Sequence, residues 1–311
     1  MRRFLAGLNG LDGKSKAQSA MEYLMTYGWA ILIIAVVMVA LFALGVFNGA
    51  NFGPRATAGA CQVVRNVESV TLQGQCQGEL PMYAAYFNGQ TSSVEIPYSP
   101  ALQPLSHFTW AAWLYIEPYQ GPPPTKYGSR IYMNGGGGSS QGWEITVPSS
   151  NLGSHAPVSA GIGLGSSEQS LSGSVPTGSW QFLAIAFNSS AGTASMYLNS
   201  NTYPIGILSF TPGTDMNAYV GNVVIGAYGD SPFDNFNGSI SNVQMYNATL
   251  SANDISSLYR EGIGGAPIDP LHIVGWWPLN GNANDYSGNS HDGTSASVSY
   301  TSSWTSGYTQ P

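Results

Sequence analysis

Residues 236–262 read "FNGSISNVQMYNATLSANDISSLYREG" and predict a strand followed directly by a helix. The first half is a short segment rich in β-branched and apolar residues and bounded by Gly, Asn and Thr, which is typical of a strand. Ser251 then stands as a helix N-cap with Asp254 three residues later, and Gly262 ends the helical pattern. This is the one convincing helix that the pattern indicates outside the N-terminal region.

Short segments of the strand type fill much of the chain from Tyr83 onward. Each is rich in aromatic and β-branched residues and is bounded by Gly, Pro, Asn or Ser, and Asn199-Ser200-Asn201 predicts a hairpin tip. The pattern predicts a mainly β fold, an antiparallel sandwich of roughly 200 residues. The segments are "YAAYFNGQTSSVEIPY" (83–98), "FTWAAWLYIEP" (108–118), "SWQFLAIAFN" (179–188), "TASMYLNSNTYPIG" (193–206) and "NVVIGAYG" (222–229).

Taken in order and ended by residues 236–262, these segments resemble a LamG-like, concanavalin A-type jelly roll. The last piece is the most specific, with a Gly-x-Ile strand, a Tyr at its end and Leu-Ser-x-x-Asp-Ile opening the helix. The resemblance implies a β-sandwich head over residues 81–311 that binds glycans or cell-surface proteins. The family usually has an acid after that Ile, and Ser241-Asn242 at this point weakens a metal role there.

Residues 272–294, "HIVGWWPLNGNANDYSGNSHDGT", resemble the opening strand of such a domain, although they stand near the end of the chain. They are either the start of a second, truncated repeat or a permuted strand that closes the same sandwich. Only 17 residues follow Thr294, too few for another sandwich. Domain termini usually lie close together, so permutation is the favoured alternative.

The composition indicates an extracellular protein. Of the 311 residues only 8% are charged, against roughly 25% in ordinary soluble domains, while 43% are hydrophobic and 12% aromatic. The net charge of -7 excludes a nucleic-acid partner, which requires clustered cations.

The N-terminal region predicts a membrane helix. The segment from Tyr23 to Phe47 holds no charged residue. It is long enough to cross a bilayer as a helix and too long for the apolar part of a secretory signal peptide. Four of the nine cations precede it, whereas past Ala17 the chain has 5 basic and 15 acidic residues. This asymmetry predicts a single-pass protein of the cell membrane with its N-terminus cytoplasmic and its head extracellular.

Glu22, at the start of this apolar region, has two readings. Ser19 and Glu22 fit a capping box, which explains the carboxylate without any function. However, "KAQSAMEY" (16–23) also resembles the class III signal of archaeal type IV pilin-like proteins.

The pilin resemblance implies a basic leader, residues 1–17, that a prepilin peptidase-like protease removes between Ala17 and Gln18. Residues 18–47 would then form a membrane or filament-core helix. In such pilins the carboxylate, here Glu22, pairs with the free N-terminal amine of a neighbouring pilin subunit in a surface filament.

The chain has two cysteines, Cys61 and Cys76, in a neck that we assign to residues 48–80. Two ligands are too few for zinc, and outside the membrane a disulfide is the default. A bridge of this span stabilises by about 3 kcal/mol. One short strand between the cysteines predicts a small hairpin clamp.

The residue pattern does not indicate an enzyme. Glycoside hydrolysis needs two nearby carboxylates, but Glu95, Glu117 and Glu144 stand in separate segments. The histidines neither cluster nor belong to a nucleophile motif.

Calcium is a candidate cofactor, because hard oxygen ligands cluster in two loop-like segments. One segment holds Asp230, Asp234 and Asn235, and the other holds Asp285, Asn289 and Asp292. The alternative is that these residues cap turns.

Aromatic residues in loop-like segments are candidates for stacking on sugar rings. Three N-x-S/T sequons, Asn188, Asn237 and Asn247, are candidate glycosylation sites. The aromatic candidates are Tyr119, Tyr127, Tyr132, Trp143, Tyr228, Phe233 and Phe236.

The sequence therefore predicts a pilin-like adhesin whose head binds glycans or surface proteins without catalysis. The alternative is a stationary, membrane-anchored envelope protein whose head is a structural or cell-contact module.

Overall fold

In a computed structural model of the chain, the structure describes residues 25, 27–40, 55–56, 59–76, 80–118, 129–135, 140–147, 153–228 and 234–311. Its contacts divide the chain into two compact units, Met1–Gly53 and Pro54–Pro311. The second unit holds the sandwich and also the disulfide hairpin that we had assigned to the neck.

In the first unit, residues 27–40 are helical and all of them are exposed. Large apolar side chains are included, with Trp29 66% and Ile31 65% exposed. Among the described residues, no helix is both long and apolar enough to cross a membrane. Ala17, Gln18 and Glu22 lie outside the described residues, as do all residues of the predicted 18–47 helix except Met25 and residues 27–40.

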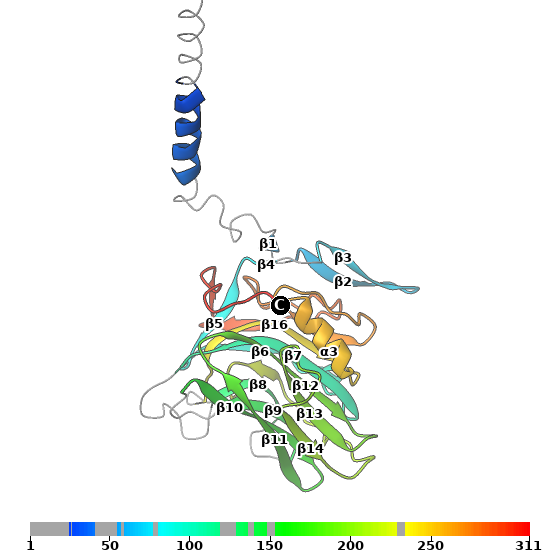
Figure 1. The fold of residues 1–311 in the computed structure, drawn as a ribbon. Coiled ribbons are helices and arrows are strands. Elements are labelled where there is room, and N and C mark those ends of the chain that lie inside the picture. Colours follow the sequence, from blue (N-terminus) through cyan, green and yellow to red (C-terminus); the bar gives the residue numbers. More distant parts are fainter. Residues whose placement is uncertain are drawn as a thin grey trace, which may run out of the picture. The chain divides into compact units, whose positions relative to one another are not determined.

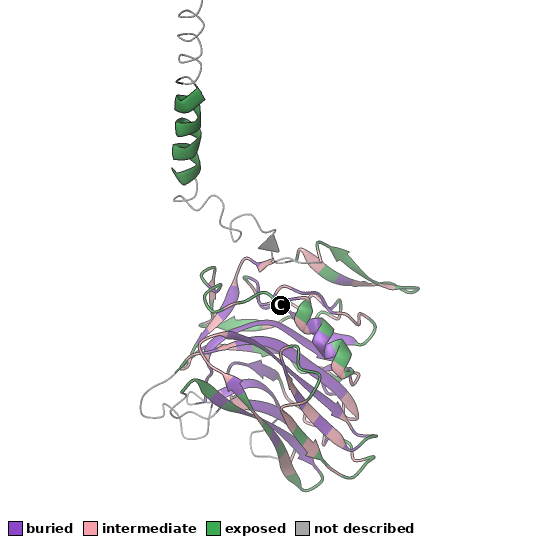
Figure 2. Cartoon of the chain, in the orientation of Figure 1, coloured by how far each residue is buried: buried purple, intermediate pink, exposed green. Residues whose placement is uncertain are grey.

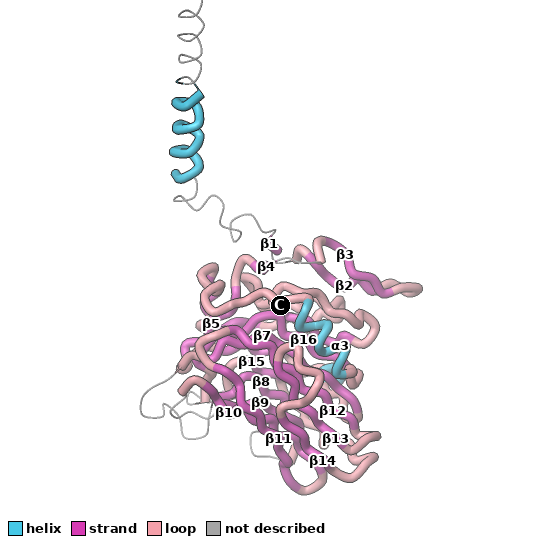
Figure 3. The backbone as a smooth tube through the Cα atoms, in the orientation of Figure 1, coloured by secondary structure: helices cyan, strands magenta, loops and turns pink. Residues whose placement is uncertain are grey.

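The second unit is built mainly of strands, and its described residues form two large sheets (Figure 1 and Figure 3). The spatial order of the seven-stranded sheet is β11 (Ser167–Pro176), β10 (His155–Leu164), β9 (Gly142–Val147), β8 (Ser129–Gly135), β15 (Val223–Ile225), β6 (Ser93–Ile96) and β18 (Thr294–Ala296). The order of the eight-stranded sheet is β14 (Gly206–Ser209), β13 (Thr193–Leu198), β12 (Trp180–Asn188), β7 (His107–Ile116), β16 (Asn237–Tyr246), β5 (Ala84–Asn88) and β19 (Ser299–Thr301), with β17 (Ile273–Trp277) also pairing with β16.

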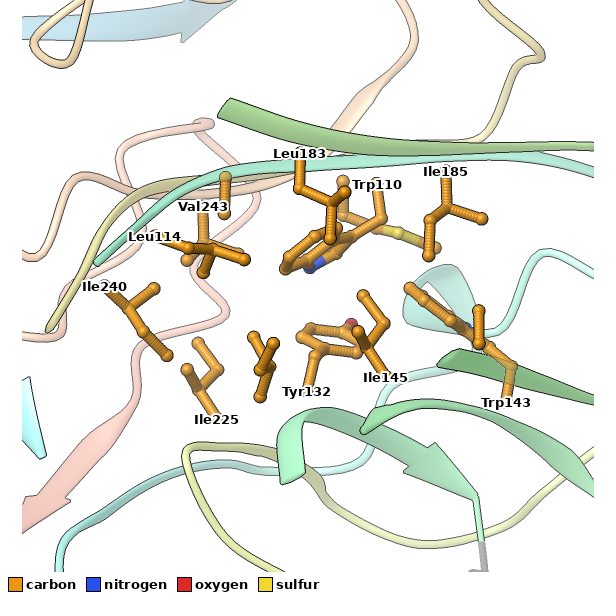
Figure 4. Packing of buried hydrophobic residues seen from close by; sticks show 14 of the residues in the cluster. Trp110, Leu114, Tyr132, Trp143, Ile145, Leu183, Ile185, Ile225, Ile240 and Val243 are labelled. Carbon is orange, nitrogen blue, oxygen red and sulfur yellow. The ribbon is translucent and has the colours of Figure 1, made fainter. Parts of the chain in front are cut away.

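The main core lies between the two sheets, as the strand pattern predicts (Figure 4). Trp110, Leu183 and Val243 from the eight-stranded sheet face Tyr132 and Trp143 from the seven-stranded sheet (Figure 4). Aromatic rings also stack in a column through this core, with successive ring centroids 4.8, 4.7, 5.2 and 5.3 Å apart. The rings of the column are, in order, Tyr132, Trp143, Phe108, Phe187 and Phe210.

The eight-stranded sheet is covered on its other face as well. A second cluster there packs Trp113 and Phe182 of the sheet against Leu258 of α3 (Ala252–Arg260) and Trp304 of the C-terminal segment. Because both faces are covered, β7 and β12 are buried along nearly their whole length (Figure 2). Their near-continuous apolar sequences follow from this double burial.

α3 confirms the predicted helix. The Ser251 side chain accepts from the backbone of Asp254, and the Asp254 carboxylate accepts from the backbone of Ser251, which makes a capping box. At the other end Gly262 has φ +80°, a conformation that glycine adopts without strain. A short 3₁₀ helix, η1 (Pro100–Leu102), follows β6.

The C-terminal segment adds strands to both sheets. β17 pairs antiparallel with β16, β18 pairs with β6 of the seven-stranded sheet, and β19 pairs with β5 of the eight-stranded sheet. The segment therefore closes this sandwich, as the permuted-strand alternative requires.

The disulfide Cys61–Cys76 is formed and closes a hairpin of β2 (Cys61–Arg65) and β3 (Val70–Gly74). Two strands thus lie between the cysteines, where the sequence indicated one. Arg65 fastens the hairpin to the C-terminal segment, because its guanidinium donates to the carbonyls of Ile273 at 2.6 Å and Ser287 at 3.3 Å. Within the predicted neck, β1 (Arg55–Ala56) also pairs in parallel with β4 (Leu80–Pro81).

Candidate functional site

The outer face of the seven-stranded sheet carries a row of directly opposed residues. Across β9, β8, β15 and β6 the row runs Glu144, Met133, Val224 and Glu95. Glu95 stands between Val94 and Ile96, which are fully buried in the core, so its side chain points to the outer face. The row is polar at both ends and apolar in the middle.

Arg130 of β8 binds two carboxylates on this face. Its Nε lies 3.2 Å from Glu144 Oε2 and its Nη1 lies 3.3 Å from Asp234 Oδ2, and all three side chains are buried. The ring of Tyr228 lies 4.6 Å from the guanidinium carbon. Because one cation joins two buried anions, this triad fixes the segment that begins at residue 234 onto β8.

Glu168 brings a further carboxylate to the same face. A Cβ at Gly161 would lie 2.6 Å from the Glu168 carboxyl, so the glycine leaves room for this side chain. Gly161 is the partner of Glu144 in the adjacent strand. Glu95, in contrast, is three strands from Glu144, about 14 Å at the usual strand spacing, which is too far for a glycosidase pair.

One accessible region beside this face is a patch that we call the Glu95 patch, made of Glu95, Tyr98, Val220 and Asn222. Asn222 Nδ2 donates to Glu95 Oε1, and Asn222 Oδ1 accepts from the backbone nitrogen of Tyr98 at 2.9 Å. All four residues are exposed, with Tyr98 at 41% and Val220 at 76%. A carboxylate and an amide thus stand together in contact with solvent, and an exposed aromatic residue and an exposed apolar residue lie close to them in the chain.

The family profile of the concanavalin A-like lectin/glucanases superfamily matches residues 88–256, more than half of the chain. The chain belongs to this superfamily. The match starts in β5 and ends within α3, so it holds the Glu95 patch and the Arg130 triad. No curated protein matches the chain significantly.

Several solved structures are similar to the chain at low sequence identity. A putative carbohydrate-binding protein from Bacteroides ovatus is 15% identical with a TM-score of 0.50, over 76% of this chain and 65% of that one. A heptameric SAP-like pentraxin from Limulus polyphemus is 16% identical with a TM-score of 0.44, over 60% and 85%. A Ruminococcus gnavus sialidase CBM40 bound to α2,3-sialyllactose is 17% identical with a TM-score of 0.38, over 50% and 83%.

In one of the two predicted calcium loops, the carboxylates already accept hydrogen bonds from the backbone. Asp285 accepts from the backbone nitrogens of Trp276, Ser287 and His291, and Asp292 accepts from the backbone of Asp285. These bonds organise the turn after β17 and leave little capacity for a cation.

The other predicted calcium loop fits a hard cation better. Oδ1 of Asp234 and Oδ1 of Asn235 are both buried without a hydrogen-bond partner. Such oxygens are the ligands that calcium prefers, although Arg130 competes for Asp234 through its other oxygen. Asp230 lies outside the described residues, and the described part of the chain holds no group of three or more acidic, His or Cys side chains that could bind a metal.

Three of the aromatic candidates are core residues and not surface residues. Tyr132, Trp143 and Phe236 are at most 1% exposed, because β8, β9 and the start of β16 turn them toward the opposite sheet. Tyr228 stacks on Arg130, while Tyr119, Tyr127 and Phe233 lie outside the described residues.

The three sequons differ in exposure. Asn247 is exposed at the end of β16, whereas Asn188 and Asn237 are half-buried. Asn188 Oδ1 also accepts from the backbone nitrogen of Ala191, which holds that side chain in a turn. Glycosylation at these sites stays a prediction.

The sequence analysis missed both polar groups on the outer face. Glu95 and Asn222 are 127 residues apart in the chain. Each is a polar residue next to a buried β-branched residue of a short strand. This pattern is too common in the sequence to single them out.

Proposed function

We propose that this protein is a cell-surface adhesin whose sandwich binds glycans at the Glu95 patch. The observation that carries the proposal is the exposed carboxylate–amide pair of Glu95 and Asn222, with exposed Tyr98 and Val220 close by in the chain, at the paired ends of β6 and β15. Sugar sites pair an apolar or aromatic surface with a few oriented polar groups, and this patch has both. Membership of a lectin and glucanase superfamily supports the same reading.

The test is a glycan array probed with the detergent-purified full chain and two matched pairs of variants. Tyr98→Ala and Glu95→Gln should each reduce binding at least about tenfold, since each removes one contact type worth more than 1 kcal/mol. Tyr203→Ala and Glu68→Gln are the controls, because Tyr203 is 84% exposed in the loop after β13 and Glu68 is exposed on the β2–β3 hairpin. Equal losses in the controls would contradict a site at this patch.

The same samples distinguish binding from catalysis. Glu144 of β9 and Glu168 of β11 lie on one face of the sheet, on either side of β10, so the bound glycans should be examined for new reducing ends. We propose that none form, because Arg130 binds Glu144 and leaves it poorly suited to a proton-transfer role.

We propose that residues 18–47 anchor the head in the cell membrane and that a prepilin peptidase-like protease removes residues 1–17. The exposed apolar side chains of residues 27–40 support an apolar environment, either lipid or the helices of other pilin subunits. N-terminal sequencing of the native membrane protein should find Gln18 first. A chain that still starts near Met1 would favour the alternative, a stationary envelope protein with a cell-contact head.

Filament assembly has its own test. Glu22→Ala should leave the protein in the membrane but prevent filaments, because the carboxylate would no longer pair with a neighbour's amine. Filaments of normal yield in this variant would contradict the role of Glu22.

We also propose that calcium binds beside Asp234 and Asn235. Calcium should then raise the melting temperature and EDTA should reverse the rise. Asn235→Ala should abolish the effect, while Asp292→Asn, in the other loop, should preserve it. A calcium response that Asp292→Asn removes would move the site to the turn after β17.

A further inference from the structure

We infer that the Glu95 patch selects neutral or amine-bearing sugars and disfavours sugars that carry a carboxylate. The inference rests on the proposed function, since it names the class of glycan that the patch accepts. It follows from the hydrogen-bonding capacity of the patch, from the charge around it and from its apolar border.

The hydrogen bonds within the patch leave it rich in acceptors. Asn222 Oδ1 accepts from the Tyr98 backbone nitrogen and keeps a second lone pair, while Asn222 Nδ2 already donates one of its two N–H groups to Glu95 Oε1. No described residue donates to Glu95 Oε2. The strongest vacant group is therefore a carboxylate oxygen, which pairs with a sugar hydroxyl or ammonium and repels a sugar carboxylate.

The acids elsewhere on the outer face carry the same sign of charge as Glu95, with Glu144 three strands away. Glu144, Glu168 and Asp234 lie on the outer face, and the guanidinium of Arg130 is shared between two of them. The other described arginine side chains lie elsewhere, with Arg65 bound to the C-terminal segment and Arg260 in the last turn of α3. Within the described part of the face, no unshared cation is present to attract an anionic sugar.

The apolar border of the patch fits the non-ionic side of a sugar ring. Val220 precedes Asn222 by two residues, Tyr98 follows Glu95 by three, and both side chains are exposed. A pyranose could place C–H groups on these side chains while a hydroxyl or amine reaches Glu95. A carboxylate on the same ring would lose water without gaining a partner.

The experiment uses matched triplets of hexose, 2-amino-hexose and hexuronate in the gluco, galacto and manno configurations, presented as polyvalent conjugates. The full chain in detergent is titrated against each at low and at high salt. For the best configuration we expect the hexose and the amino sugar to bind at least about fivefold more tightly than the uronate. The advantage of the amino sugar over the hexose should shrink with salt.

Glu95→Gln tests the residue, because the amide keeps the shape and loses the charge. The uronate penalty should fall to less than about twofold in this variant, while Glu68→Gln should keep the wild-type order. Uronates that bind as tightly as hexoses, or a preference that Glu95→Gln leaves unchanged, would overturn this inference while leaving glycan binding intact. Failure to bind any conjugate would overturn the proposed function and this inference with it.

Discussion

The indole nitrogen of Trp276 donates a 2.7 Å hydrogen bond to Oδ1 of Asn242. Trp276 belongs to β17, near the end of the chain, and Asn242 belongs to β16, the strand that pairs with β7, β5 and β17. Asn242 has φ +53° at the bulge of β16 and also donates through Nδ2 to the carbonyl of Gly265 at 2.8 Å. One side chain thus joins the out-of-order strand, the middle of the eight-stranded sheet and the segment after α3.

The dependence of the sandwich on its C-terminal strands can be tested at Trp277. This side chain is 0% exposed, packs in the main core and donates through Nε1 to the carbonyl of His291 at 2.9 Å. Trp277→Ala should lower the free energy of unfolding by about 3–5 kcal/mol in urea denaturation. Trp29→Ala, which changes an exposed Trp of the first unit, is the control and should leave this transition unchanged.

A deletion tests the same dependence more severely. Removal of residues 270–311 takes away β17, β18 and β19, and it leaves Trp180 Nε1 without the Trp304 carbonyl that it donates to at 2.7 Å. The variant should show no cooperative unfolding transition. Melting like that of the full chain would mean that the segment is a dispensable stub.

The parts of this fold that could be predicted are those with a local signal. The spacing of Ser251 and Asp254 predicts the start of α3. The long apolar segments of β7 and β12 are readily predicted as strands, because both of their faces are buried. β10 and β11 were not predicted, since "HAPVSAGIGL" and "SEQSLSGSVP" place small and polar residues on an outer face and resemble loops. β8 and β9 border a Pro- and Gly-rich stretch, which makes their sequences loop-like and predicts surface positions for Tyr132 and Trp143, whereas both are core residues.

The candidate site was harder to predict because its contacts are not local. Arg130 meets Asp234, and Asn222 meets Glu95, only because β8, β15 and β6 are neighbours in the sheet. The order of the strands in a sheet is set by the packing of the whole sandwich. It cannot be predicted from the spacing of residues in the sequence.

The disulfide should make a moderate contribution to stability. Cys61 and Cys76 are 15 residues apart, and a loop of that length is worth about 3 kcal/mol in the chain-entropy model. The double variant Cys61→Ser, Cys76→Ser should lose about 2–4 kcal/mol in guanidinium denaturation. Dithiothreitol should lower the stability of the wild type to that of the variant and leave the variant itself unchanged, and a response of the variant to dithiothreitol would contradict this account.

Two buried tyrosines should respond oppositely to loss of their hydroxyl groups. Tyr132 and Tyr246 are both 0% exposed, but the Tyr132 hydroxyl has no hydrogen-bond partner whereas that of Tyr246 donates to Gln244 Oε1 at 2.5 Å. Burial raises the pKa of both hydroxyls, so both are neutral at ordinary pH. Tyr132→Phe should raise the free energy of unfolding by up to about 1 kcal/mol, and Tyr246→Phe should lower it by about 1–2 kcal/mol. Equal changes in the two variants, measured by urea denaturation, would show that the Tyr132 hydroxyl is satisfied in solution.

Asp215 should give the sandwich an acid-sensitive contact between loops. The hydroxyls of Ser189 and Ser106 donate to this carboxylate and, together with the nearby His107, lower its pKa below the ordinary 3.8. Because the folded pKa lies below the unfolded one, the carboxylate contributes stability above pH 3.8, and that contribution is lost as the pH falls through the folded pKa. An NMR titration of the Asp215 carboxyl from about pH 6 to pH 2 should therefore find a midpoint below the ordinary value. Replacing both serines by alanine should return the midpoint toward 3.8, since these hydroxyls are the largest causes of the shift. A midpoint at or above 3.8 in the wild type would mean that the serines do not donate to the carboxylate in solution.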